Sequence, residues 1–190
     1  MLTKEDELTI LEAQIRECFG RVIYTHKTHS KMADRAALRL KWLKICQIVL
    51  SSLTASGAVS LVFSNQYALK LTTALVSLGT VTLTAYMKGF DPGAEAQKHR
   101  DTAADIWPIR ESYLSLLTDI RAGDVDLKQL RQRRDELQNA LTAIYKGAPQ
   151  TSSEAYVDAQ IALKKNEEYT FSDEELDVFL PQALKRKNRS

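Results

Sequence analysis

The chain has 190 residues, a length that suits one domain or slightly more. Its 26 lysines and arginines nearly balance 24 aspartates and glutamates, so the formal net charge is only +2. This balance gives no electrostatic basis for nucleic-acid binding, and we expect no direct binding of nucleic acid. The charges are segregated, however, because Lys70 is the only charged residue between Lys44 and Lys88.

Residues 1–44 are charged and carry a helical pattern. The acidic start, MLTKEDELT, does not resemble a secretory signal peptide. Apolar residues then recur at spacings of three and four, which predicts an amphipathic helix. These residues are Leu8, Leu11, Ile15, Cys18 and Val22. The helix is expected to run into the following apolar segment, although Gly20 weakens that prediction.

Residues 45–87 form the apolar segment, which divides into two stretches, 45–63 and 68–87. As a helix, 45–63 would be about 28 Å long, close to the roughly 30 Å of a bilayer core. The turn-forming residues SNQY at 64–67 force the two stretches into an antiparallel hairpin. The alternative is a buried hairpin in a soluble protein, but two adjacent spans of membrane length favour a transmembrane hairpin.

The residues around the hairpin predict its orientation. Lysines and arginines precede the first span and follow the second, whereas the connecting turn has none. The positive-inside rule therefore places both termini in the cytoplasm. Aromatic residues lie where interface belts are expected, with Trp42 and Tyr86 on the inner side and Phe63 and Tyr67 on the outer side.

Residues 88–190 are predicted to form a cytoplasmic helical domain. GFDPG at 89–93 breaks the second span, and helices are expected over 94–121, with Pro108 a kink, and over 126–146. No stretch of the chain alternates with the period of a strand, so the fold class is an all-α membrane protein.

Two capping boxes predict further helices near the C-terminus. Thr151 with Glu154 would open a helix that runs to about residue 168. Ser172 with Glu175 would open a second, shorter helix.

The segment YTHKTHSKMAD raises the question of a metal site. His26 and His29 share a helix face, Asp34 follows, and His99 returns to the same side of the membrane. The zinc-protease pattern H-E-x-x-H is absent, so we prefer a polar helix face to a metal site. Nucleotide-binding loops, a nucleophile elbow and a CxxC pair are also absent. We therefore expect no enzyme activity, no cofactor and no metal.

Each span carries a line of small polar residues. On the second span they recur at alternating spacings of four and three, which keeps them on one side of the helix. This line contains Gln66, Lys70, Thr73, Ser77, Thr80, Thr84 and Lys88. On the first span Ser52, Ser56, Ser60 and Ser64 recur at intervals of four.

Two interpretations of these lines remain open. The hydroxyls either help helices to pack in lipid, or the second-span line faces a wet pathway between several assembled hairpins. Packing needs few contacts, and the first-span ridge supplies them, so we predict separate roles for the two lines. The pore-lining candidates are Lys70, Thr73, Ser77, Thr80 and Thr84, and the helix-packing candidates are Ser52, Ser56 and Ser60. Lys70 lies at the outer interface or at the pore mouth.

Five stretches together resemble the SLATT domain, the SMODS and SLOG-associating two-transmembrane effector family. They are RVIYTHKTHSKMADR, WLKICQIVLSSLTASG, HRDTAADIWPIRESYLSLLTDIRAGD, RRDELQNALTAIYKGAPQTSSEAY and EEYTFSDEELDVFLP. The resemblance covers about residues 21–181 and supplies no catalytic residue. It implies a membrane effector of a bacterial antiviral conflict system, encoded beside a sensor such as a nucleotide second-messenger synthase or a reverse transcriptase.

The sequence as a whole predicts an abortive-infection effector in the bacterial inner (plasma) membrane. It would form a homo-oligomer in the lipid bilayer and form or open a depolarising pore on a signal from its sensor. The alternative is a non-conducting anchor that recruits a partner enzyme through its cytoplasmic helices. Trp42, Tyr67 and Tyr86 are the predicted membrane-interface residues.

Overall fold

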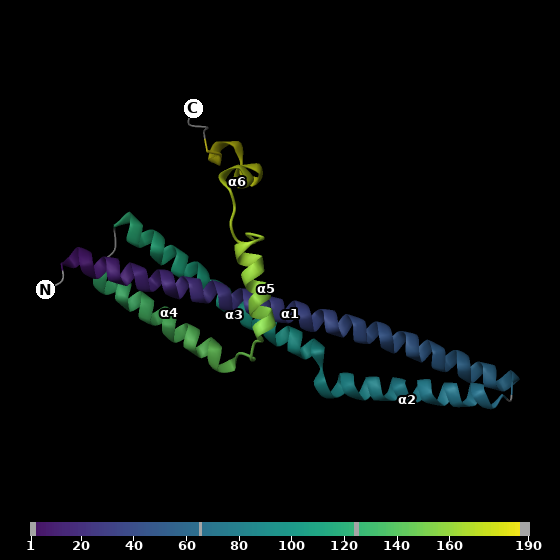
Figure 1. Cartoon of the computed structure of the whole chain (residues 1–190). Coiled ribbons are helices and arrows are strands. Elements are labelled where there is room, and N and C mark those ends of the chain that lie inside the picture. The colour runs from purple at the N-terminus through teal and green to yellow at the C-terminus, as the bar shows by residue number, and fades with distance from the viewer. Residues whose placement is uncertain (1–2, 65, 124–125, 187–190) are drawn as a thin grey trace.

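The computed structural model describes residues 3–64, 66–123 and 126–186, and that part of the chain contains helices and no strand (Figure 1). The elements are α1 (Lys4–Phe63), α2 (Tyr67–Phe90), α3 (Pro92–Ala122), α4 (Leu127–Gly147), α5 (Ser153–Lys164), α6 (Asp173–Phe179) and the short 3₁₀ helix η1 (Gln182–Leu184). The predicted all-α class is confirmed.

Helix α1 is a single rod of 60 residues. At about 1.5 Å per residue it is roughly 90 Å long, so it extends from the cytoplasmic bundle through the first span. It begins with a capping box in which the Asp6 amide donates to Thr3 Oγ1 at 3.1 Å and the Thr3 amide donates to the Asp6 carboxylate at 2.9 Å. Gly20 does not interrupt the helix, because packing on both sides of it outweighs one weak helix former.

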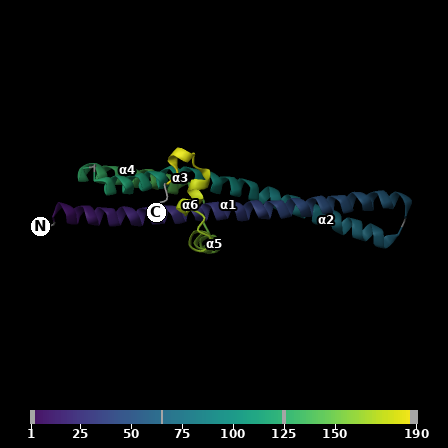
Figure 2. The ribbon, with the colours of Figure 1, turned by 90° about the horizontal axis from the view of Figure 1, so that it is seen from above.

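Helix α2 runs back beside the second half of α1, and both views show the pair as a hairpin at one end of the molecule (Figures 1 and 2). Both arms of this hairpin include an 18-residue window that is apolar enough to cross a membrane, and no residue of either window is buried. A soluble protein would bury such windows in its core. Their exposure therefore supports the predicted transmembrane hairpin.

The first half of α1 packs with α3 and α4 to form the cytoplasmic bundle (Figure 1). Asp91, in the left-handed region at φ 35°, ends α2 and accepts from the Ala94 amide at the start of α3. Pro92 occupies the first turn of α3, where a missing N–H is tolerated, and α3 continues through Pro108. The core contains the predicted apolar face of α1 and residues of α3 and α4: Leu11, Ile15, Cys18, Val22, Ile106, Tyr113, Leu116, Ile120, Leu130 and Leu137.

Helix α5 packs across α1 through the buried alanines Ala155 and Ala159, whose small side chains allow a close approach. The prediction of Thr151 as its cap was wrong by one residue, because the Ser152 hydroxyl accepts from the Ala155 amide at 3.2 Å. The helix also ends at Lys164, earlier than predicted, because the chain turns through Glu167 at φ 50°.

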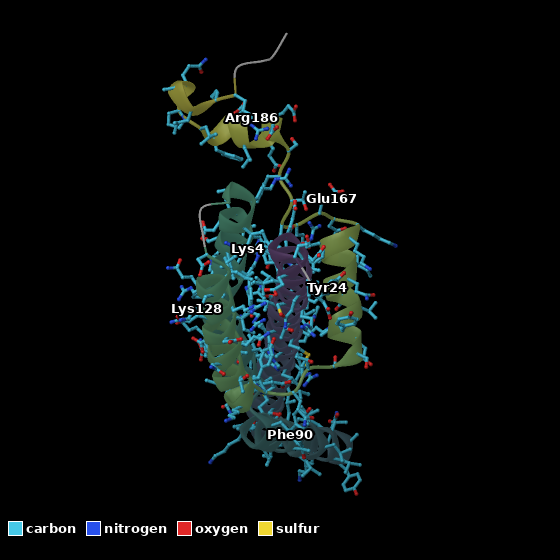
Figure 3. The ribbon with its side chains drawn as sticks, turned by 90° about the vertical axis from the view of Figure 1, so that its left-hand side faces the viewer. Lys4, Tyr24, Phe90, Lys128, Glu167 and Arg186 are labelled. Carbon is cyan, nitrogen blue, oxygen red and sulfur yellow. The ribbon has the colours of Figure 1, made fainter. Side chains whose placement is uncertain are left out.

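The chain beyond α5 leaves the bundle. Ser172 caps α6 by accepting from the Glu175 amide at 3.2 Å, as predicted. Residues 170–186, called the arm below, contain α6 and η1 and project to one side of the long axis of α1 (Figure 1). Figure 3 shows the same separation, with Glu167 at the end of α5 and Arg186 in the arm, away from α1 and α4.

Candidate functional site

The candidate site is the transmembrane hairpin, whose two helices meet along faces with alternating spacings of four and three. On α1 the partly buried positions of this face are Leu43, Gln47, Leu50, Thr54, Gly57 and Leu61. On α2 they are Leu69, Thr73, Val76, Thr80, Leu83 and Met87. Such a pattern gives left-handed, coiled-coil-like packing of antiparallel helices.

Polar groups interrupt the apolar residues of this contact and form what we call the polar seam. It consists of Gln47, Thr54 and Gly57 of α1 and Thr73, Thr80 and Thr84 of α2. The Gln47 amide donates to Thr84 Oγ1 at 3.1 Å, and the hydroxyls of Thr54 and Thr80 lie 3.5 Å apart. Gly57 allows the closest approach, since a Cβ there would lie 2.4 Å from Thr73 Oγ1. The hairpin therefore places polar groups inside and apolar groups outside.

The outer surface of the hairpin is strongly apolar. Val62, Leu53 and Ile48 of α1 and Leu75, Leu78 and Val81 of α2 are each at least half exposed. In lipid this distribution is favourable, because apolar side chains meet acyl chains and hydroxyls find partners between helices.

Of the predicted lining residues, Thr73, Ser77 and Thr80 lie partly buried on the side of α2 that faces α1. Thr84 is exposed yet still accepts a hydrogen bond from α1, and Lys70 is exposed near the turn. The single chain thus keeps most of the predicted lining closed against its own first span. Whether this line faces water in an assembly stays a prediction.

The serine ridge lies on the outer surface of α1. Ser52, Ser56 and Ser60 are exposed, and each hydroxyl donates to the carbonyl oxygen four residues earlier, at 2.8 to 2.9 Å. Their hydrogen bonds are satisfied locally, so the ridge offers a smooth surface for another helix. Its predicted role in packing between helices also stays a prediction.

The predicted interface aromatics are exposed at the two ends of the hairpin. Trp42 is 59% exposed and Tyr86 42% exposed at the cytoplasmic end, and Tyr67 is 79% exposed beside the turn. Their positions are compatible with the two headgroup regions, where amphipathic rings are favoured.

The histidines that suggested a metal site lie below the hairpin, between α1 and α3. His29 and His99 are buried, and their Nδ1 atoms lie 2.9 Å apart, so one donates and the other accepts. Within the described residues no third His, Cys, Asp or Glu joins them in a group that could hold a metal. Asp34 is exposed, and His26 points to a different partner.

His26 belongs to a cluster that fixes the base of the arm, called the Tyr169 anchor below. Its members are His26, Lys27, Trp107, Arg110, Glu168 and Tyr169. The Tyr169 hydroxyl lies 3.0 Å from His26 Nδ1, and Glu168 pairs with the buried Lys27. Arg110 stacks over the Trp107 ring at 4.5 Å and over the Tyr169 ring at 4.7 Å.

Burial decides the protonation of these groups. It lowers the pKa of His26 to about 4, with further lowering by Arg110 and Lys27. It also lowers the pKa of His29 to about 4, with His99 and His26 adding to the effect. The hydrogen bond from Lys27 lowers the pKa of Glu168. At neutral pH the cluster therefore contains neutral histidines and an ionised Lys27–Glu168 pair.

Sequence reasoning did not predict the Tyr169 anchor or the face that α2 turns toward α1. The anchor joins residues that are 143 positions apart, and no local pattern marks such a contact. The seam did leave a signal, because Gly57 and the polar residues near it repeat with the same spacing as the line on α2.

Taken together, the fold and the hairpin define a two-span membrane protein with a helical domain on one side of the membrane. Its particular family follows from the sequence, since residues 11–175 match the SMODS and SLOG-associating 2TM effector domain family 4. The chain belongs to this family, and the SLATT resemblance is confirmed. Comparisons with curated proteins and with solved structures gave no match. The family description names an effector and indicates no catalytic activity.

Proposed function

We propose that the protein oligomerises and forms or opens a pore that depolarises the bacterial inner membrane. In this proposal it acts in antiviral defence of the abortive-infection type, on a signal from a genomically linked sensor. Both termini, and hence the bundle that would receive the signal, lie in the cytoplasm. The sensor would be a nucleotide second-messenger synthase or a reverse transcriptase.

The observation that carries this proposal is the polar seam. A plain anchor needs only apolar contacts, yet the hairpin keeps a row of hydroxyls and one carboxamide along most of the bilayer depth. Thr73, Thr80 and Thr84 all belong to this row and all contact or approach α1 in the single chain. The seam corresponds to a closed state, in which the polar faces of the two spans satisfy each other.

Opening then requires the spans of several copies to rearrange. The serine ridge of Ser52, Ser56 and Ser60 would pack between neighbouring hairpins, because small residues allow close contact in lipid. Rotation or separation of α2 would expose Thr73, Ser77, Thr80 and Thr84 to a shared pathway, with Lys70 near its outer mouth. Since α1 continues from the bundle into the membrane, movement of the cytoplasmic helices reaches the seam through one rigid rod.

Membrane potential measured with a voltage-sensitive dye in bacteria that express the protein tests this function. The seam variant Thr73→Val, Thr80→Val, Thr84→Val removes the hydroxyls and keeps the side-chain shape. The matched control Thr72→Val, Thr82→Val removes two hydroxyls from the exposed face of the same helix. We expect wild type and control to depolarise cells on activation and the seam variant to lose the effect at equal membrane level. Depolarisation by the seam variant would contradict the assigned pathway.

A non-conducting anchor is the second candidate function, in which the cytoplasmic helices recruit a partner enzyme. It is favoured by the complete pairing of the seam within one chain, which leaves no hydroxyl of Thr54, Thr80 or Thr84 in need of water. Replacing 45–87 with an unrelated apolar hairpin separates the two candidates. An anchor would keep its function after the exchange, and a pore would lose it.

A further inference from the structure

The arm carries apolar side chains that nothing in the described chain covers. Phe171 is 56% exposed, Val178 74%, Phe179 75% and Leu184 66%. These side chains share a short segment with the acidic residues Asp173, Glu174, Glu175 and Asp177. An exposed group of large apolar residues with a charged border is typical of an interaction surface.

The base of this arm is held firmly. Glu168 pairs with Lys27 and lies 3.4 Å from Lys31, and the Tyr169 hydroxyl contacts His26 at 3.0 Å. Lys27 also lies 4.6 Å from the centre of the Tyr169 ring. The arm therefore leaves the bundle from a fixed point and in a fixed direction, unlike a loose tail.

A groove of about 750 Å³ lies between α1, α4 and α5 on the same bundle. Its lining includes Cys18, Arg21, Tyr24, Tyr113, Tyr145 and Tyr156. Figure 3 shows Tyr24 on the part of α1 that faces α5. A neighbouring hollow of about 530 Å³ shares Tyr24, Tyr145 and Tyr156 with it and extends the groove toward Thr151. The groove is thus long, aromatic and open enough for a short helix.

The groove also lacks a hydrogen-bond acceptor. Tyr113 is fully buried, and its hydroxyl has no partner. The side chains of Arg21 and Gln138 donate only to the sulfur of Cys18, at 3.4 and 3.6 Å, and sulfur is a weak acceptor. A buried donor without a partner calls for an explanation, and carboxylates from an incoming segment would provide the missing acceptors.

The arm and the groove lie at the same height along α1. The anchor contacts α1 at residues 26 and 27, and the groove is lined by α1 residues from 17 to 29. Because α1 continues into the membrane, this height is about 27 Å below the first span in every copy. The arm projects across the axis of α1, parallel to the plane of the membrane when α1 crosses it upright (Figures 1 and 2).

We propose that the arm of one copy packs into the groove of the neighbouring copy in the membrane. Val178 and Phe179 enter the aromatic lining, and the carboxylates of α6 accept from the donors that the groove leaves without strong acceptors. Each copy gives one arm and receives another, which is a heterologous contact that closes into a ring when the rotation permits. This inference rests on the homo-oligomer of the proposed function and gives it a cytoplasmic interface.

Photo-cross-linking from Phe179 tests the contact directly. p-Benzoylphenylalanine at this position is expressed in the full chain, in membranes that also contain a heavy-nitrogen-labelled copy. We expect cross-links between light and heavy chains that map to α1 residues 17–29, to α4 near Tyr145 or to Tyr156. Cross-links confined to the same chain, to lipid or to an unrelated protein would overturn the proposal, and so would their absence.

Two variants and a control complete the test, with the photo-cross-linker placed at Phe171 instead. Val178→Asp with Phe179→Asp changes residues that make no core contact, and Gly20→Phe fills the groove, since a Cβ at Gly20 meets no atom within 4 Å. Both should lower the inter-chain yield by about tenfold or more, because the arm loses its apolar burial. Ile10→Asp, at an exposed apolar residue outside arm and groove, should leave it unchanged. Unchanged yields in the arm variant would contradict the proposal.

The outcomes separate this inference from the proposed function. Inter-chain cross-links in cells that stay polarised on activation would support the arm contact and count against the pore. Depolarisation without inter-chain cross-links would support the pore and overturn the arm contact.

Discussion

Replacing Gly57 with alanine adds one methyl group where α1 and α2 approach most closely. The new Cβ would lie 2.4 Å from Thr73 Oγ1, 3.0 Å from its Cγ2 and 3.2 Å from its Cβ. Rotation of Thr73 moves only the first two atoms, and a β-branched side chain in a helix has few rotamers. The helices must therefore separate, and overpacking of this kind typically costs about 1–3 kcal/mol.

Gly79→Ala is the matched control within the same hairpin. A Cβ at Gly79 meets no atom within 4 Å, so this change adds only helix propensity, which favours the helix by about 0.5–1 kcal/mol. Because both substitutions gain the same propensity, the difference between them reports the contact at Thr73 alone.

The assay measures hairpin closure through a disulfide between α1 and α2. Thr54→Cys with Thr80→Cys, in a chain with Cys18→Ala and Cys46→Ala, replaces two hydroxyls that lie 3.5 Å apart. The effective concentration of this pair in glutathione buffers should fall about 5- to 150-fold in Gly57→Ala relative to Gly79→Ala. Equal values in the two variants would refute the close approach of α1 and α2 at Gly57.

Three further predictions follow from the cytoplasmic bundle. Because the pKa of His26 and of His29 falls from 6.5 to about 4 on folding, their contribution to stability is complete above pH 6.5 and is lost as the pH falls toward 4; each contributes about 3 kcal/mol over that interval. Thermal unfolding followed by the fluorescence of Trp107, whose ring centre lies 5.3 Å from that of His26, should show this loss, and an unchanged melting temperature down to pH 4 would contradict it. Tyr169→Phe removes the hydrogen bond to His26 and should cost about 1 kcal/mol while making the arm easier to cleave in limited proteolysis, whereas the exposed Phe171→Leu should leave cleavage unchanged. Ile15→Ala empties a fully buried position between α1 and the rest of the bundle and should lower the free energy of unfolding by about 2–5 kcal/mol in a denaturant titration; a loss below that of the exposed Ile10→Ala would show that the core is not packed as described.

The helices and the hairpin were predictable because their signals are local. The contrast between charged and apolar stretches defines 45–63 and 68–87 as spans, and apolar spacing marks the core face of α1. The cap of α5 was misplaced by one residue, since Thr151 and Ser152 both carry a hydroxyl and only their backbone geometry distinguishes them.

The orientation of the two polar lines was not predictable, because it depends on how each span rotates about its own axis. Both lines have valid helical spacing, and sequence alone does not say which of them meets the other span. The structure turns Thr80 toward Thr54 and leaves Ser56 on the outside. The same limit applies to the Tyr169 anchor, which tertiary packing creates from residues on three distant segments.

The most direct test of the central claim is to lock the polar seam while recording conduction. The Thr54→Cys, Thr80→Cys chain without its native cysteines is activated in spheroplasts under a voltage-sensitive dye, after oxidation with copper phenanthroline and again after reduction. The account predicts that oxidised cells stay polarised, that reduction restores depolarisation, and that the parent chain without the cysteine pair ignores both treatments. Full depolarisation with the disulfide formed would contradict a pathway that opens along the seam between α1 and α2.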